Sequence, residues 1–321
     1  MEGSKLYCRT PLIESLPLSK LAGREVYLKL ENAQPTSSFK QRGLSFRALE
    51  IFKEGYRDVV IASGGNAGMA MAYCARKLGM GATIVVPEAT TTATRVKLEQ
   101  QGARLRIHGS NWSETNKTAL QIAKETGAFY IHPFDHPTIW KGNATLVREI
   151  YQDVPSKPSL IVTCVGGGGL LCGLVEGLRD VGWDDVPIVA METRGAESYN
   201  ASIKAGKLVT LPKITSIATT LGACTVCPKS FEYASVHEII SEVTDDARAV
   251  SSCLKFADDH KILVEPSCGA SLSAVYDGFV SDLFANGRPK GEGPVVVVVC
   301  GGNDVSLNLL EKWKSRFLNN V

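Results

Sequence analysis

The chain has 321 residues, a length that fits two domains rather than one hydrophobic core. Hydrophobic residues make up 44% of it and charged residues 21%, an ordinary composition for a globular protein. The formal net charge of +2 gives no basis for nucleic-acid binding, and no apolar run approaches the roughly 18 residues of a transmembrane helix. We therefore expect no nucleic-acid partner and no membrane partner.

The cysteines and the N-terminus favour a cytoplasmic location. Nine cysteines is an odd number, and Cys164 and Cys172 lie in apolar segments, which indicates buried reduced thiols rather than a disulfide framework. The first eight residues carry neither an apolar signal core nor an Arg- and Ser-rich presequence. Cys224 and Cys227 form a C-x-x-C without the second pair of ligands that a structural zinc site needs.

Short β-branched segments alternate with helical periodicity along the chain. In the first half we predict strands at 26–31, 58–62, 82–86, 104–108 and 129–132, and helices at 40–55, 67–78, 92–101 and 113–126. Residues 133–137 break the pattern as a loop, and we assign no role to Asp135 or His136 there. In the second half we predict strands at 160–165, 188–192 and 295–300, and helices at 170–181, 197–205, 229–235, 245–260, 267–286 and 305–317. This alternation predicts an α/β fold with open, mostly parallel sheets.

A single lysine, Lys40, stands at the head of a predicted helix, after the stretch Pro35-Thr36-Ser37-Ser38-Phe39. The positive end of a helix disfavours a charged ammonium and lowers the pKa of the lysine. Such a lysine is suited to Schiff-base chemistry. The alternative is a solvated lysine in the first turn of a surface helix.

Two glycine-rich segments each join a predicted strand to a predicted helix, where parallel sheets bind ligands. Gly166–Gly169 gathers backbone N–H groups at a helix N-terminus, which suits a phosphate. The alternatives are a dinucleotide site, with Glu192 ending the next strand, and a merely tight turn. The segment 63–68 (SGGNAG) suits a carboxylate, or is a turn in which Asn66 caps the helix.

Together with Cys300-Gly301-Gly302-Asn303, these motifs occur in an order that resembles the fold-type II pyridoxal-phosphate (PLP) enzymes. The closest resemblance is to the short serine/threonine dehydratases, and it runs from about Thr10 to the C-terminus. It implies a tryptophan synthase β-like architecture of two open, mostly parallel α/β/α domains. The small domain would span 42–136, inserted into a large PLP-binding domain at 1–41 and 137–321, and the protein would be a homodimer.

The same resemblance implies a PLP-dependent L-serine/L-threonine ammonia-lyase, which eliminates water from its amino-acid substrate to give ammonia plus pyruvate or 2-oxobutanoate. Lys40 would bind the aldehyde of PLP and take the Cα proton of the substrate. The implied cofactor-binding residues are Phe39, Lys40, Asn66, Gly166, Gly167, Gly168, Gly169, Leu170 and Cys300. The implied substrate-binding residues are Ser63, Gly64, Asn66, Ala67 and Phe134.

Two positions bear on the type of reaction. Gly64 stands where many relatives have alanine or serine, and where serine racemases have a serine as second acid/base. Glycine has no proton to give, which favours elimination. Cys300 would face the pyridine nitrogen, and a thiol with an ordinary pKa near 8.5 cannot keep that nitrogen protonated as a carboxylate would. The alternative for Cys300 is a buried structural thiol.

Some alternatives stay open from the sequence. Glu192, with backbone carbonyls of Gly166, Ala196, Leu221 and Ala223, matches the monovalent-cation site of related dehydratases and implies K⁺, although an ordinary strand-end glutamate would look the same. Other activities to be weighed are β-replacement of the cysteine-synthase type, serine racemisation, a weakly active or non-catalytic PLP-binding homologue and, outside PLP chemistry, a nicotinamide oxidoreductase.

Overall fold

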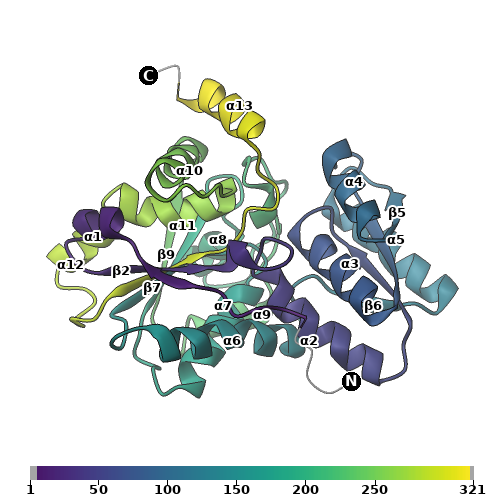
Figure 1. Ribbon diagram of the computed structural model, residues 1–321, viewed down its shortest axis with the longest axis horizontal. Helices are drawn as coiled ribbons and strands as arrows, with labels where there is room; N and C mark the ends of the chain where they lie inside the picture. Colours follow the sequence, from purple (N-terminus) through teal and green to yellow (C-terminus); the bar gives the residue numbers. More distant parts are fainter. Residues whose placement is uncertain (1–5, 319–321) are drawn as a thin grey trace.

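The computed structural model describes residues 6–318, which fold around two separate sheets (Figure 1). The larger sheet has six strands in the order β1-β2-β10-β7-β8-β9, and only the edge strand β1 is antiparallel to its neighbour. The strands are β1 (Leu12–Glu14), β2 (Val26–Leu30), β7 (Leu160–Cys164), β8 (Ile188–Thr193), β9 (Ile239–Thr244) and β10 (Val295–Val299). The five valines of β10 are fully buried, as expected for a central strand covered on both faces.

Helices cover both faces of this sheet, with α10 and α11 on one side and α6, α7 and α9 on the other (Figure 1). The helices around the larger sheet are α1 (Leu16–Ala22), α6 (Pro137–Asp153), α7 (Gly169–Asp180), α8 (Ser198–Ala205), α9 (Pro228–Tyr233), α10 (Asp246–His260), α11 (Pro266–Tyr276), α12 (Phe279–Ala285) and α13 (Leu307–Phe317). Among residues 6–318, none of the helices combines the length and the apolar character that crossing a membrane requires.

The smaller sheet is wholly parallel, in the order β5-β4-β3-β6. Its elements are β3 (Asp58–Ala62), α3 (Asn66–Leu78), β4 (Gly81–Val86), α4 (Thr92–Gln100), β5 (Arg104–Ile107), α5 (Trp112–Thr126) and β6 (Phe129–Ile131). Alternate residues of β3 face opposite ways: Val60 and Ala62 pack with Ala119 of α5, whereas Val59 and Ile61 join the main core. The predicted α/β class with mostly parallel sheets is confirmed.

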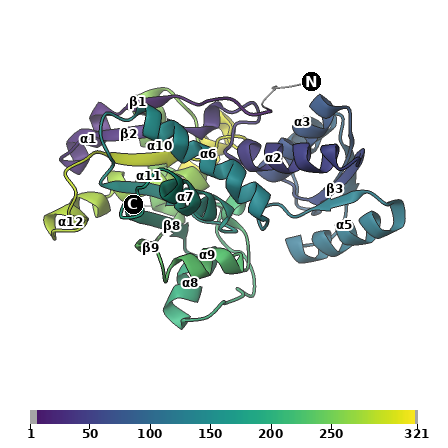
Figure 2. The ribbon, with the colours of Figure 1, turned by 90° about the horizontal axis from the view of Figure 1, so that it is seen from below.

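Helix α2 (Lys40–Lys53) contacts both α3 and α6, and so lies where the two sheet systems meet (Figure 2). Its buried residues Leu44, Ala48 and Ile51 recur at the helical spacing, which gives the helix one apolar side. The predicted domain boundary after residue 41 falls within the first turn of this helix, and the domain limits stay a prediction.

The structure corrects several predicted elements. Helix α6 has no counterpart among the predicted helices, and it begins at Pro137, the last residue of the stretch 133–137 that the sequence predicts to be a loop. Pro137 is instead the first helical residue, where a missing N–H costs nothing, and the His136 side chain caps the helix by accepting from Thr138 N. Strands β1 and β9 and helix α1 were also missed. The helix predicted at 267–286 is two helices, α11 and α12, separated at Gly278 with φ of 84°.

Candidate active site

A cavity of about 530 Å³ lies where β3, β4, β7 and β10 end. The residues that the sequence predicted for cofactor and substrate all line it: Phe39, Lys40, Ser63, Gly64, Asn66, Ala67, Phe134, Gly166, Gly167, Gly168, Gly169, Leu170 and Cys300. Because parallel strands present their carboxyl ends at one edge of a sheet, motifs far apart in the sequence meet here.

Lys40 is the first residue of α2, and its Nζ donates to the Pro133 carbonyl oxygen at 2.9 Å. The Nζ atom lies 5.4 Å from the ring centroid of Phe39 and 5.6 Å from that of Phe134. Burial lowers the pKa of Lys40 to about 8, and the neighbouring Cys164 and Cys227 offset part of the effect. The predicted direction of the shift holds, but its main cause is burial rather than the helix N-terminus.

Main-chain contacts hold the lysine segment against the segment that follows β10. Phe39 N donates to the Cys300 carbonyl at 3.0 Å, and Gly302 N donates to the Ser37 carbonyl at 2.9 Å. Ser38 and Gly301 form an isolated antiparallel bridge between these contacts. The first and last motifs of the sequence are therefore fixed to each other by backbone hydrogen bonds.

The glycine segment Gly166–Gly169 leads from β7 into α7, with Gly168 in the left-handed region at φ of 89°. A Cβ on Gly167 would lie 2.4 Å from the Phe134 ring, so the close packing of that ring itself requires glycine. In the described part of the chain, the N–H groups of Gly167 to Leu170 donate to no protein acceptor. A cradle of unused donors at a helix N-terminus fits the phosphate of PLP.

Asn66 contacts a buried carboxyl group that the sequence did not predict. Its Nδ2 donates to Glu265 Oε1 at 2.8 Å, and Thr220 and Ser267 donate to the same oxygen at 2.9 and 2.7 Å. Burial raises the pKa of Glu265, and Asn66 Oδ1 has no partner among the described residues. The unpartnered Oδ1 belongs to a side chain that lines the cavity, so it is a polar atom available to a ligand.

Cys300 is buried at the end of β10, with its Sγ 3.3 Å from Cys164 Sγ. The pKa of Cys300 is well above its ordinary value, because hydrogen bonds with Cys164 and Cys268 and burial disfavour the thiolate. The cavity wall therefore carries a neutral thiol at this point, not a charged group.

Glu192 does not line the cavity. It is fully buried, and its carboxylate accepts from Tyr199 N at 2.8 Å and Asn200 N at 2.7 Å, at the start of α8. Burial raises its pKa to about 8. Of the other predicted cation ligands, Gly166, Leu221 and Ala223 line the cavity and Ala196 does not. Residues 6–318 contain no group of three or more His, Cys, Asp or Glu side chains suited to a metal, and the cation site stays a prediction.

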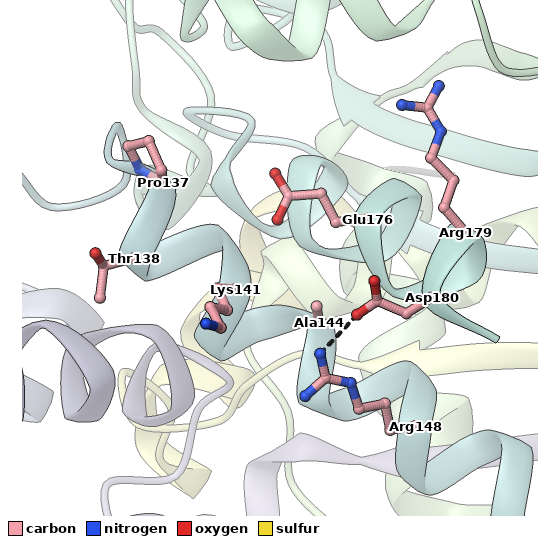
Figure 3. Close-up of a pocket in the computed structure, with 8 residues that line it drawn as sticks. All are labelled: Pro137, Thr138, Lys141, Ala144, Arg148, Glu176, Arg179 and Asp180. Atoms are coloured by element: carbon pink, nitrogen blue, oxygen red, sulfur yellow. Dashed lines mark hydrogen bonds and ion pairs between the residues drawn. The ribbon is translucent and has the colours of Figure 1, made fainter.

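A second cavity, of about 490 Å³, lies between α6 and α7 and contains none of the predicted residues (Figure 3). Arg148 donates to Asp180 at 2.6 Å within it. Its lining residues are Pro137, Thr138, Lys141, Ala144, Arg148, Glu176, Arg179 and Asp180.

The first cavity also has lining residues outside the predicted site. These are chiefly Thr90, Trp112, Thr220, Glu265, Ser267, Asp304, Leu309 and Trp313. They lie outside the glycine-rich motifs, and no local sequence pattern marks them as site residues.

Comparison with known proteins places the chain in a family. The sequence profile described as "Pyridoxal-phosphate dependent enzyme" matches residues 4–301. The chain is 48% identical to "Serine dehydratase-like" of Rattus norvegicus, over 98% of this chain and 99% of the relative. It is 50% identical to "L-serine dehydratase/L-threonine deaminase" of Mus musculus, over 96% and 95%.

Solved structures agree with this placement. A fungal L-serine ammonia-lyase from Rhizomucor miehei superposes with a TM-score of 0.91 at 35% identity, covering 98% of this chain and all of that one. Maize serine racemase superposes with a TM-score of 0.87 at 26% identity, over 98% and 94%. With a profile match over nearly the whole chain and relatives near 50% identity, the chain belongs to the family of pyridoxal-phosphate dependent enzymes.

Proposed function

We propose that the protein is a PLP-dependent L-serine/L-threonine ammonia-lyase. The observation that carries the proposal is the placement of the Lys40 amine, with its lowered pKa, in one cavity with the glycine segment. PLP would be held by Lys40, by the N–H groups of Gly167 to Leu170, by Asn66 and by contact with Cys300. When bound, PLP withdraws electrons from the Cα atom of an amino acid and so acidifies its Cα–H bond.

The chain's own residues supply a base, a carboxylate-binding site and an uncharged contact for the cofactor ring. Because burial favours the neutral form of Lys40, its Nζ is a competent base for the substrate Cα proton. The backbone N–H groups of Gly64, Asn66 and Ala67 at the start of α3 bind the substrate carboxylate, whereas Ser63 N already donates to Val85 O at 3.1 Å. The neutral Cys300 thiol does not place a charge beside the cofactor ring, which favours loss of the β-hydroxyl as water over longer-lived carbanion chemistry.

The cofactor attachment and the reaction products test the proposed function. The purified protein should show the visible absorbance of a PLP–lysine adduct, and borohydride reduction followed by peptide mapping should recover the cofactor on Lys40. Incubation with L-serine or L-threonine should release ammonia and a keto acid in equal amounts. The variant Lys40→Ala should lose keto-acid production while staying folded. Recovery of the reduced cofactor on another lysine would overturn the assignment.

We further propose that a monovalent cation, K⁺, binds between Glu192 and the carbonyl groups of Gly166, Ala196, Leu221 and Ala223. The support is the close approach of two of these segments: a Cβ on Gly166 would lie 3.0 Å from Leu221 Cα. Exchange of K⁺ for Li⁺ should lower both activity and melting temperature, and Glu192→Gln should remove the difference between the two ions. Equal activity in both salts would refute the site.

The proposal extends to assembly and location: a cytoplasmic homodimer that degrades amino acids, with domain limits at 41/42 and 136/137. Sedimentation velocity of the holoenzyme measures the oligomeric state, and a single species of 34.5 kDa would exclude the dimer.

A further inference from the structure

The loops that follow β3 and β4 lie side by side, because these two strands are paired in parallel. Gly64 belongs to the first loop and Thr90 to the second. A Cβ built on Gly64 would lie 2.5 Å from Thr90 Oγ1, 3.3 Å from Thr90 Cγ2 and 3.5 Å from Pro87 Cδ. The space that a side chain at position 64 would enter is therefore filled by the side chain of Thr90.

The hydroxyl of Thr90 makes no hydrogen bond within the described chain, unlike those of Thr91 and Thr94. Thr91 caps α4 by accepting from Thr94 N, and the hydroxyl groups of Thr91 and Thr94 lie 2.9 Å apart. Thr94 also donates to Asp304 at 3.4 Å. Only the backbone N–H of Thr90 makes a hydrogen bond, to Pro87 O at 3.0 Å, whereas its side chain lines the active-site cavity. The Thr90 hydroxyl is thus available to a ligand.

We propose that Thr90 determines substrate specificity, by filling the wall that Gly64 leaves open and by hydrogen-bonding a polar group of the amino-acid substrate. This inference rests on the ammonia-lyase function proposed above. The methyl group of Thr90 limits the space beside the substrate. The hydroxyl group of Thr90 replaces the polar contact that a serine at position 64 would offer. Gly64 and Thr90 then form an exchange pair, since a larger residue at 64 requires a smaller one at 90.

The experiment compares holoenzymes of the wild type and the variants Gly64→Ala, Thr90→Ala, Gly64→Ala/Thr90→Ala and Thr90→Val. KM and kcat are measured with L-serine and with L-threonine, alongside the cofactor spectrum and the melting temperature. Thr92→Val is the matched control, because Thr92 is exposed at the start of α4 and does not line the cavity.

Thr90→Val keeps the shape and removes the hydroxyl, and should raise the KM for L-serine about 10-fold with an unchanged cofactor spectrum. Gly64→Ala should lower kcat/KM about 10-fold or more, and the added Thr90→Ala should restore most of that loss. The proposal would be overturned if the effects of Gly64→Ala and Thr90→Ala on kcat/KM simply multiply in the double variant. It would also be overturned if Thr90→Val has the same KM for L-serine as the wild type. A Thr90→Val enzyme that loses cofactor would show a structural role and also overturn it. By contrast, a wild-type protein that releases no keto acid would refute the proposed function itself.

Discussion

Arg42, two residues after Lys40, carries a fully buried guanidinium group that fixes the start of α2. It donates to Glu31 at 2.7 and 2.8 Å and to Glu149 at 2.8 and 2.6 Å, while Lys29 donates to Glu149 at 2.7 Å. These four side chains come from β2 and the residue directly after it, from α2 and from α6, so they hold the lysine-bearing turn to two neighbouring elements. The sequence did not indicate the network, because nothing local pairs Arg42 with a glutamate 107 positions away.

Replacing Arg42 by methionine should destabilise the protein by about 3–5 kcal/mol, since it leaves two buried carboxylates without their main partner. The measurement is urea unfolding. As control, Arg9→Ala breaks the exposed ion pair with Asp153 and should cost at most about 1 kcal/mol. The network lowers the pKa of Glu149 below its ordinary 4.5, so its contribution to stability is present above pH 4.5 and is lost as the pH falls through the lowered pKa. Equal losses in the two variants would contradict this account.

The lowered pKa of Lys40 predicts how cofactor uptake depends on pH. Only the neutral amine attacks an aldehyde, and burial makes the amine half neutral near pH 8. The rate at which cofactor-free protein takes up PLP should therefore rise from pH 6.5 to pH 9 with an apparent pKa of about 8. Stopped-flow absorbance measures it. A rate still rising steeply at pH 10 would mean that the lysine titrates as an exposed one.

At the scale of elements, some glycines are required by a positive φ and others by close packing. The sequence alone does not distinguish these two requirements. Gly278 divides α11 from α12 because its φ is positive, and a Cβ there would meet nothing within 4 Å. Gly167 has an ordinary φ, but a Cβ would enter the Phe134 ring. The sequence located the glycine segment correctly as a strand-to-helix turn, whereas it took 267–286 as one helix because the periodicity continues across the break.

Replacing Gly278 by alanine should affect stability, whereas replacing Gly167 by alanine should affect cofactor binding. Gly278→Ala should cost about 1 kcal/mol in stability through backbone strain alone, and leave the PLP content unchanged. Gly167→Ala should push Phe134 away from the glycine segment and lower the PLP content of the purified protein at least about 10-fold. The ratio of PLP absorbance to protein absorbance measures this effect. A Gly167→Ala protein that retains full PLP content would show that the ring yields without disturbing the cofactor site.

At the scale of the whole molecule, the cavity is lined by residues from both sheet systems. The cavity can be predicted from the sequence because the glycine-rich motifs follow the ends of strands. A strand end followed by glycines is a local pattern, and a parallel fold brings such ends together. The partners that complete the site, Glu265 beside Asn66 and Thr90 beside Gly64, depend on how the two sheets and their loops pack. No local sequence pattern indicates this packing. The sequence therefore predicts the glycine-rich motifs but not Glu265 or Thr90.

A ligand bound by both sheet systems should stabilise the molecule as a unit. PLP would join Lys40 and Asn66 to the glycine segment after β7, so its removal deletes contacts on both sides of the cavity at once. At about 100 times its Kd, a ligand of the folded state contributes about 2.7 kcal/mol, which for a chain of this size corresponds to a Tm about 5 °C higher. Calorimetry of holoenzyme, of protein stripped with hydroxylamine and of stripped protein given PLP again measures the difference. Hydrogen exchange should slow in α2 and at residues 166–170 when PLP returns. Stabilisation confined to one sheet system, with the other unchanged in exchange, would contradict a cofactor that bridges the two.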